Sequence, residues 1–96
     1  MTVMPEDQLG GMTLTLAVAQ ELRAHMARQR VSQRQLARIL HVSHQWVSQR
    51  LLGVVAMSTV DIERIASALG ISERRLLLDA LNSLEEETGT GTGIRR

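Results

Sequence analysis

Apolar residues recur every three or four positions over most of the chain, a spacing that places them on one face of a helix. The first stretch has an apolar residue at every fourth position: Leu14, Val18, Leu22 and Met26. Thr13 or Thr15 can cap this helix, because a threonine hydroxyl accepts a hydrogen bond from a backbone N–H of the first turn. We therefore expect a first helix that runs to about Arg30.

Four more helices are predicted by serines that stand before similar stretches. These N-cap candidates are Ser32, Ser43, Ser58 and Ser72. The stretches after them cover about residues 33–40, 44–52, 59–69 and 73–84. Gly53 and Gly70 follow the third and fourth helices, where glycine commonly ends a helix. The side chains expected to face inward are Leu36, Ala37, Leu40, Val47, Leu51, Val60, Ile62, Ile65, Ala66 and Leu69. Caps, stops and spacing agree, so the sequence predicts an all-α domain of five helices.

Composition agrees with one small helical domain and excludes several other classes. With 96 residues, 44% of them hydrophobic, the chain can build a single core. It has no cysteine, which excludes disulfides and thiolate chemistry. No apolar run reaches the roughly 18 residues of a membrane span, and residues 1–11 do not resemble a secretory signal. We expect a cytoplasmic protein with a flexible arm at 1–12, a folded domain at 13–86 and a disordered Gly/Thr tail at 87–96.

The net charge of +1 conceals an uneven distribution. All eleven basic residues are arginine, and six of them lie between Glu21 and Leu52 against a single acid, a sum of +5. From Val60 to Glu87 there are seven acids against three arginines, a sum of −4. A basic half on a small domain is typical of a protein that binds a polyanion, although an arginine-rich solvated face has the same composition.

The segment 33–52 carries the functional pattern, because two short helices are joined there by only His41-Val42-Ser43. So short a turn forces the helices to cross steeply, with their backbones close together. Ala37 supplies the small side chain that this contact needs, and Val47 supplies an apolar partner on the following helix. The outer face of that helix then consists of His44, Gln45, Ser48 and Gln49.

That polar face suits the edges of base pairs in the major groove of double-stranded DNA, since glutamine can pair with adenine through N6 and N7. Helix N-termini, with free N–H groups and a positive dipole end, suit the phosphates. The candidates for backbone contact are Ser32, Gln33, Arg34 and Arg38 at the second helix, Trp46 and Arg50 at the flanks of the third, and Ser58 and Thr59 at the start of the fourth.

Residues 31–53 (VSQRQLARILHVSHQWVSQRLLG) resemble the helix-turn-helix of the Cro and phage-repressor family. Residues 60–72 (VDIERIASALGIS), followed by Leu76-Leu77, are similar to the closing helices of that family. The resemblance covers about residues 20–80. It implies a compact, lambda-repressor-like bundle of five helices that regulates transcription, as a repressor that binds a near-palindromic operator as a homodimer.

Individual roles also follow from the resemblance. It gives Gln33 a phosphate contact, it gives His44, Gln45 and Gln49 base contacts, and it places Ser48 near bases or backbone. The chain departs from the family pattern at His41, which replaces the glycine common in the turn and must adopt a left-handed backbone. A second departure is Arg50, which replaces an apolar or aromatic residue.

Several single residues have more than one interpretation. Trp46 can pack on the DNA backbone or a thymine methyl, lie partly buried between the second and third helices, or contact a protein. His41 and His44 are three residues apart, but no cysteine or acid lies near them to complete a zinc site, so no metal is predicted. No acid in the motif orients a histidine, so we predict no enzyme. We also expect no cofactor or small-molecule ligand, since 96 residues leave no room for a ligand-sensing domain beside this one.

The fifth helix has more leucine than a buried stripe requires, which indicates self-association unless these residues only close the core. The predicted dimer surface consists of Val54, Val55, Met57, Leu77, Leu78 and Leu81. Two other functions remain open. One is a protein-interaction module such as an antitoxin or anti-repressor. The other is RNA binding, which is disfavoured because Trp46 is the only aromatic residue that could stack on bases.

Overall fold

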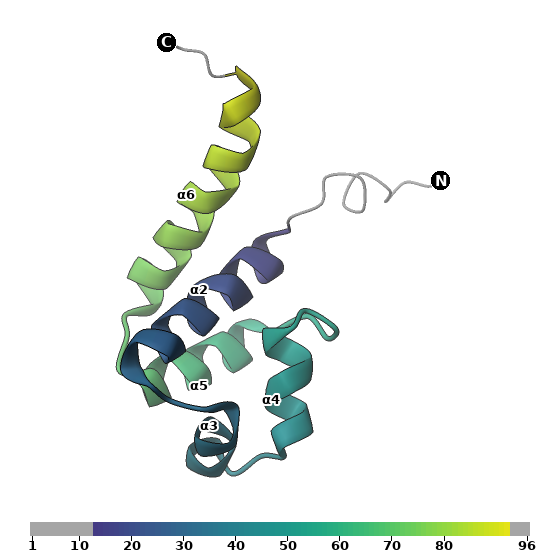
Figure 1. Cartoon of the computed structure of the whole chain (residues 1–96), viewed down its shortest axis with the longest axis vertical. Helices are drawn as coiled ribbons and strands as arrows, with labels where there is room; N and C mark the ends of the chain where they lie inside the picture. Colours follow the sequence, from purple (N-terminus) through teal and green to yellow (C-terminus); the bar gives the residue numbers. More distant parts are fainter. Residues whose placement is uncertain (1–12, 93–96) are drawn as a thin grey trace.

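The computed structural model describes residues 13–92, and the side chains of residues 13–85. This part contains five helices and no strand: α2 (Leu14–Gln29), α3 (Gln33–Leu40), α4 (His44–Leu51), α5 (Thr59–Leu69) and α6 (Glu73–Thr92) (Figure 1). The predicted all-α class and the predicted order of helices are confirmed. The arm expected at 1–12 and the last part of the tail, 93–96, lie outside the described residues.

The predicted caps are present at all five helix starts. Each capping hydroxyl accepts a hydrogen bond from the backbone N–H three residues on, and the residues concerned are Thr13, Ser32, Ser43, Ser58 and Ser72. Gln35 and Asp61 complete capping boxes, because their side-chain oxygens accept from the backbone N–H groups of Ser32 and Ser58 at 2.7 and 3.0 Å. The helix starts therefore depend on neighbours three residues away.

A buried cluster of Leu, Ile, Val, Ala and Met side chains joins the helices. α2 contacts α4, α5 and α6, so it lies at the centre of the bundle, and α6 runs along it (Figure 1). The fully buried large side chains are Val18, Leu22, Leu36, Val47, Leu51, Ile65 and Leu76. Trp46 is only partly buried and packs against this core.

Val60 is the one predicted inward side chain of α5 that faces solvent, with 58% of its surface exposed. It precedes buried Ile62 by two residues, which corresponds to a rotation of about 200° around a helix. The buried stripe of α5 begins at Ile62 for this reason, and the prediction for Val60 was wrong.

α6 ends later than the sequence predicts, at Thr92 instead of about Leu84. Glutamates follow Leu84 at positions 85–87, and glutamate is a good helix former. Each further residue of an existing helix also adds a backbone hydrogen bond. Residues 87–92, expected to be disordered, are helical in the structure although glycine and threonine are weak helix formers. This end of α6 extends beyond the other helices (Figure 1). No helix within 13–92 is both long and apolar enough to cross a lipid bilayer.

Candidate nucleic-acid interface

The turn between α3 and α4 is closed by two backbone hydrogen bonds. His41 has a φ of 60°, and its N–H donates to the carbonyl of Arg38 at 3.2 Å. The N–H of Val42 donates to the carbonyl of Ala37 at 3.0 Å. His41 thus adopts the left-handed backbone that the sequence requires of it, and the chain reverses out of α3 within three residues.

The crossing of α3 and α4 has the small, buried contact that the sequence predicts. Ala37 is 5% exposed and Val47 is fully buried, and both belong to the same core cluster. Because Val47 faces inward, residues on the opposite side of α4 face solvent. Gln45, two positions before Val47, lies about 200° around the helix from it.

The four predicted base-reading residues of α4 differ in exposure. His44 and Gln45 are exposed, whereas Ser48 and Gln49 are half-buried. Nε2 of His44 donates to Oε1 of Gln33 at 3.2 Å, which joins the first turns of α3 and α4. The structure therefore brings a predicted phosphate contact next to a predicted base reader.

The N-terminus of α3 adjoins this face and keeps some of its polar groups available. The Ser32 hydroxyl and backbone N–H are both used by the capping box with Gln35. The N–H groups of Gln33 and Arg34, in the first turn, have no carbonyl partner within the helix. Arg34 and Arg38 are exposed and lie one turn apart, so a positive dipole end and two guanidinium groups occupy one side of α3.

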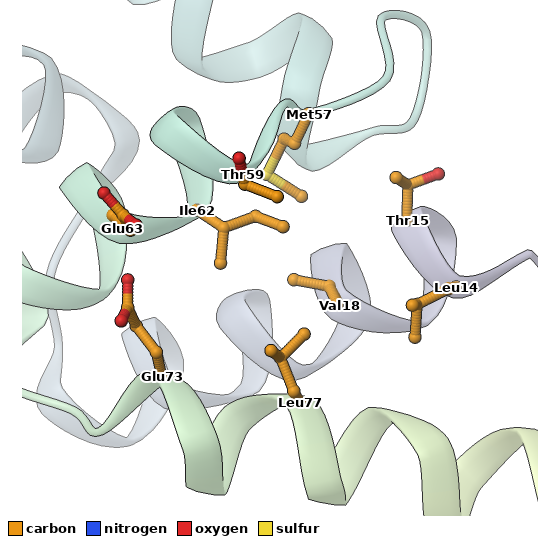
Figure 2. Close-up of a pocket in the computed structure, with 9 residues that line it drawn as sticks. All are labelled: Leu14, Thr15, Val18, Met57, Thr59, Ile62, Glu63, Glu73 and Leu77. Carbon is orange, nitrogen blue, oxygen red and sulfur yellow. The ribbon is translucent and has the colours of Figure 1, made fainter.

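The predicted backbone contacts at the start of α5 also make contacts within the protein. The hydroxyl and the N–H of Ser58 are both hydrogen-bonded to Asp61. The Thr59 side chain lines an apolar pocket beside Met57 and Ile62 (Figure 2). Ser58 and Thr59 are both exposed, so their hydroxyl protons and the backbone N–H groups of the first turn of α5 stay candidates for a phosphate contact.

Trp46 is held within the protein by two arginines. The guanidinium carbon of Arg50 lies 4.1 Å from the centroid of the Trp46 ring, and that of Arg64 lies 5.6 Å from it. Arg64 also donates to the carbonyl of Leu40 at 2.8 Å, so α5 is tied to the end of α3. The ring is partly buried, and the arginines beside it come from α4 and α5.

Arg50 is engaged by Trp46 and Asp61 at the same time. Its Nε donates to Oδ2 of Asp61 at 3.3 Å, and its Nη1 donates to the carbonyl of Trp46 at 3.3 Å. Burial alone would raise the pKa of the Asp61 carboxyl, but hydrogen bonds from Ser58 and Arg50 outweigh it and hold that pKa below its ordinary value. The departure from the family pattern at Arg50 thus corresponds to an ion pair that joins α4 to the capping box of α5.

Three long-range contacts that the sequence analysis did not predict join the helices around the motif. Arg23 of α2 donates to the carbonyl of Leu51 at the end of α4. Gln29 donates to the carbonyl of Leu69 at 2.9 Å, as Arg64 does to Leu40. Each joins residues 24 to 40 positions apart, so no local pattern could have identified them.

The residues predicted for dimer contact are only partly brought together. Met57 and Leu77 line a pocket of about 380 Å³ between α2, α5 and α6 (Figure 2), but Met57 is 5% exposed and belongs to the core. Leu81, one turn after Leu77, is exposed. Leu78 is exposed about 100° further around α6, and Val54 is exposed on the loop after α4. Val55 is half-buried.

Comparison with known proteins gives a family match and a structural match. The family described as "Helix-turn-helix domain" matches residues 17–80, which is more than half of the chain. Comparison of the sequence with curated proteins found no match.

Two solved structures of the clp gene regulator ClgR from Corynebacterium glutamicum are similar to this chain. The first has 29% sequence identity and a TM-score of 0.70, over 75% of this chain and 94% of that one. The second has 26% identity and a TM-score of 0.76, over 83% of this chain and 85% of that one.

Proposed function

The chain belongs to the helix-turn-helix family, of the Cro-like type, and from this membership we propose that it is a DNA-binding transcription regulator and not an enzyme. One observation carries the proposal. Buried Val47 turns Gln45 toward solvent, and exposed His44 beside it is hydrogen-bonded to Gln33 at the N-terminus of α3. A polar helix face and a cationic helix end next to each other match a base edge and the phosphate beside it. The similarity to ClgR, a gene regulator, supports the same function.

In the proposed mechanism, α4 enters the major groove while α3 lies across the DNA backbone. Gln33, Arg34 and Arg38 contact phosphates and fix the register of the protein on the duplex. The residues that select the sequence are His44, Gln45, Ser48 and Gln49. The hydrogen bond between His44 and Gln33 holds both elements in place before DNA arrives.

Trp46 and Arg50 have a smaller part in this mechanism than the sequence predicts. Their side chains are stacked on each other and partly buried, and Arg50 is paired with Asp61. We propose that they fix the orientation of α4 relative to α5, so that they act on DNA binding through the position of the reading face.

We further propose that the chain acts as a homodimer on a palindromic operator and represses transcription by excluding polymerase. It would act in the cytoplasm, at the nucleoid. If the chain is phage-encoded, this is the cytoplasm of the host. The exposed apolar side chains of Leu78 and Leu81 on α6, and of Leu14 on α2, support self-association. A two-fold dimer would present two copies of α4, and half-sites about one helical turn of DNA apart would match them.

Selection of bound sites from a random duplex library tests the whole proposal. The expected result is a consensus with two-fold symmetry and half-sites about 10 base pairs apart. A consensus without symmetry would support DNA binding but refute the proposed dimer.

The same experiment separates the alternatives. Failure to retain any duplex at low salt would refute DNA binding, and it would leave the protein-interaction module as the better hypothesis. Preference for single-stranded RNA over duplex DNA in a direct competition would instead support RNA binding.

A further inference from the structure

Three side chains able to bind a metal converge where α2 packs along α6. Glu21 and His25 come from α2, and Asp79 comes from α6. One ligand atom of each lies within 4.8 Å of the other two, and all three residues are half-buried. None of the three belongs to the proposed DNA-binding surface on α3 and α4.

We propose that Glu21, His25 and Asp79 bind a divalent transition-metal ion of the Zn²⁺ class. Zinc accepts carboxylate and imidazole donors at about 2.0–2.2 Å, so the ligand atoms around a tetrahedral ion lie about 3.3 Å apart. The donors within 4.8 Å of one another must therefore close by at most about 1.5 Å. Rotation of half-buried side chains can supply that movement, and water takes the fourth position.

The backbone places the three donors independently of their charges. Glu21 and His25 are four residues apart, which makes them neighbours on one face of α2. Asp79 lies between Leu76 and Ala80, both fully buried, so packing of α6 in the core determines where its carboxylate emerges. The donors are therefore held together by the hydrophobic core, despite the repulsion between two carboxylates.

A hydrogen bond and an ion pair from residues outside the cluster contact the two carboxylates. The Ser83 hydroxyl donates to Oε2 of Glu21 at 3.2 Å. Nε of Arg75 lies 3.5 Å from Oδ1 of Asp79. Each contact uses one of the two carboxylate oxygens and leaves the second for an ion. Outer partners of this kind are typical of protein metal sites, where they fix the direction of the ligand.

Arg28 competes with a metal ion for His25, so one substitution should strengthen metal binding while others should abolish it. Its Nη2 lies 3.3 Å from Nδ1 of His25, and because a guanidinium only donates, it occupies the lone pair of that nitrogen. An ion at Nδ1 displaces Arg28. An ion at Nε2 moves the ring proton to Nδ1 and breaks the same contact. Removing Arg28 should therefore strengthen metal binding.

A bound ion would join α2 to α6 close to the leucines proposed for self-association, since Asp79 lies between Leu78 and Leu81 in the chain. Metal could then control dimer formation, and through it operator binding. This consequence rests on the proposed function, but the site itself does not.

The test uses the full chain after treatment with a chelator. Calorimetric titration with ZnCl₂ should give one ion per chain, and the Tm should rise with ZnCl₂ concentration because the folded state alone binds the ion. MgCl₂ should have little effect, since Mg²⁺ prefers oxygen ligands in an octahedral arrangement.

Matched variants locate the ion. His25→Asn and Asp79→Asn should lose zinc binding, whereas His41→Asn, the same change at an exposed histidine of the turn, should retain it. Ser83→Ala should weaken binding about tenfold, and Arg28→Ala should tighten it. Thermal unfolding without metal shows whether each variant is folded.

Either of two results would overturn the proposal: no binding by the wild-type chain, or binding that survives both His25→Asn and Asp79→Asn. DNA binding measured in the presence of chelator is a separate readout. A chain that binds its operator without zinc and ignores zinc would refute the metal site and leave the proposed function intact.

Discussion

Replacing Arg50 by Met removes a guanidinium that makes three contacts inside the bundle. These are the ion pair with Asp61 at 3.3 Å, the hydrogen bond to the Trp46 carbonyl at 3.3 Å, and the stacking on the Trp46 ring at 4.1 Å. Methionine keeps a flexible apolar chain of similar reach over the indole, so the substitution tests the charge more than the packing.

The expected loss can be worked out from these contacts. The Arg50 and Asp61 side chains are 18% and 16% exposed, so solvent screens their ion pair only in part. A hydrogen bond to a charged group contributes about 1.5–3 kcal/mol, and a cation–π contact at least about 0.5 kcal/mol. Asp61 keeps its bond from the Ser58 N–H, and methionine keeps some contact with the ring. We therefore expect the free energy of unfolding to fall by about 2 kcal/mol, which lowers the Tm by roughly 8–16 °C in a domain of this size.

Circular dichroism during thermal and urea unfolding measures the loss, with Arg74→Met at an exposed position of α6 as the matched control.

Because the pKa of Asp61 is lowered in the folded state, its stabilisation is present above the pKa of the unfolded carboxyl. That stabilisation is lost as the pH falls through the folded pKa, and Arg50→Met should reduce this acid dependence. A double-mutant cycle with Asp61→Asn should give a coupling of about 1 kcal/mol or more. The reasoning would be refuted if Arg50→Met had the same Tm and urea midpoint as the wild type. It would also have to lower, by about one, the slope of log DNA affinity against log salt concentration.

Three other substitutions test the reading face, the phosphate contact and the end of α4. Gln45→Ala should cost roughly 1–3 kcal/mol on the selected operator and little on random duplex, and equal losses in both titrations would remove it from base readout. Arg34→Ala should weaken binding to every sequence and lower the salt slope by about one, and an unchanged slope would exclude a phosphate contact. Gly53→Ala should lower the free energy of unfolding by more than Gly70→Ala, as measured in urea. Both glycines have positive φ, but a Cβ at Gly53 meets the Leu16 side chain whereas one at Gly70 meets nothing within 4 Å. Equal losses would mean that backbone strain alone decides the cost.

The helices of this bundle are predictable because their limits depend on short-range interactions. A serine hydroxyl bonds to a backbone N–H three residues on, and the oxygens of Gln35 and Asp61 reach back by the same distance. Such contacts can be recognised from adjacent letters of the sequence. The errors concern features that a cap does not determine. Val60 depends on its rotation relative to the core, and the end of α6 lies in a Gly/Thr stretch whose composition does not favour a helix.

The reading face is predictable for a related reason, since Ala37 and Val47 meet across a turn of three residues. The contacts that hold this face in place are not predictable in this way, because they join helices that are distant in the sequence. Arg50 reaches Asp61 eleven positions away, and Arg64 reaches Leu40 across 24. The same holds for Glu21 and Asp79, which are separated by 58 positions and meet only because α2 packs along α6.

The arginines show how one residue type can serve either the DNA-reading face or the contacts that hold it in place. A guanidinium is always charged and carries five donors, so the same residue type serves a phosphate or a buried carboxylate equally well. Composition places Arg34, Arg38 and Arg50 in one basic segment, and only the packing separates them. Arg34 and Arg38 stay exposed on α3, while Arg50 turns onto Trp46 and Asp61. Loss of Arg34 should therefore change salt-dependent DNA affinity at constant stability, and loss of Arg50 should change stability first. A measurement of both quantities on both variants distinguishes the two roles.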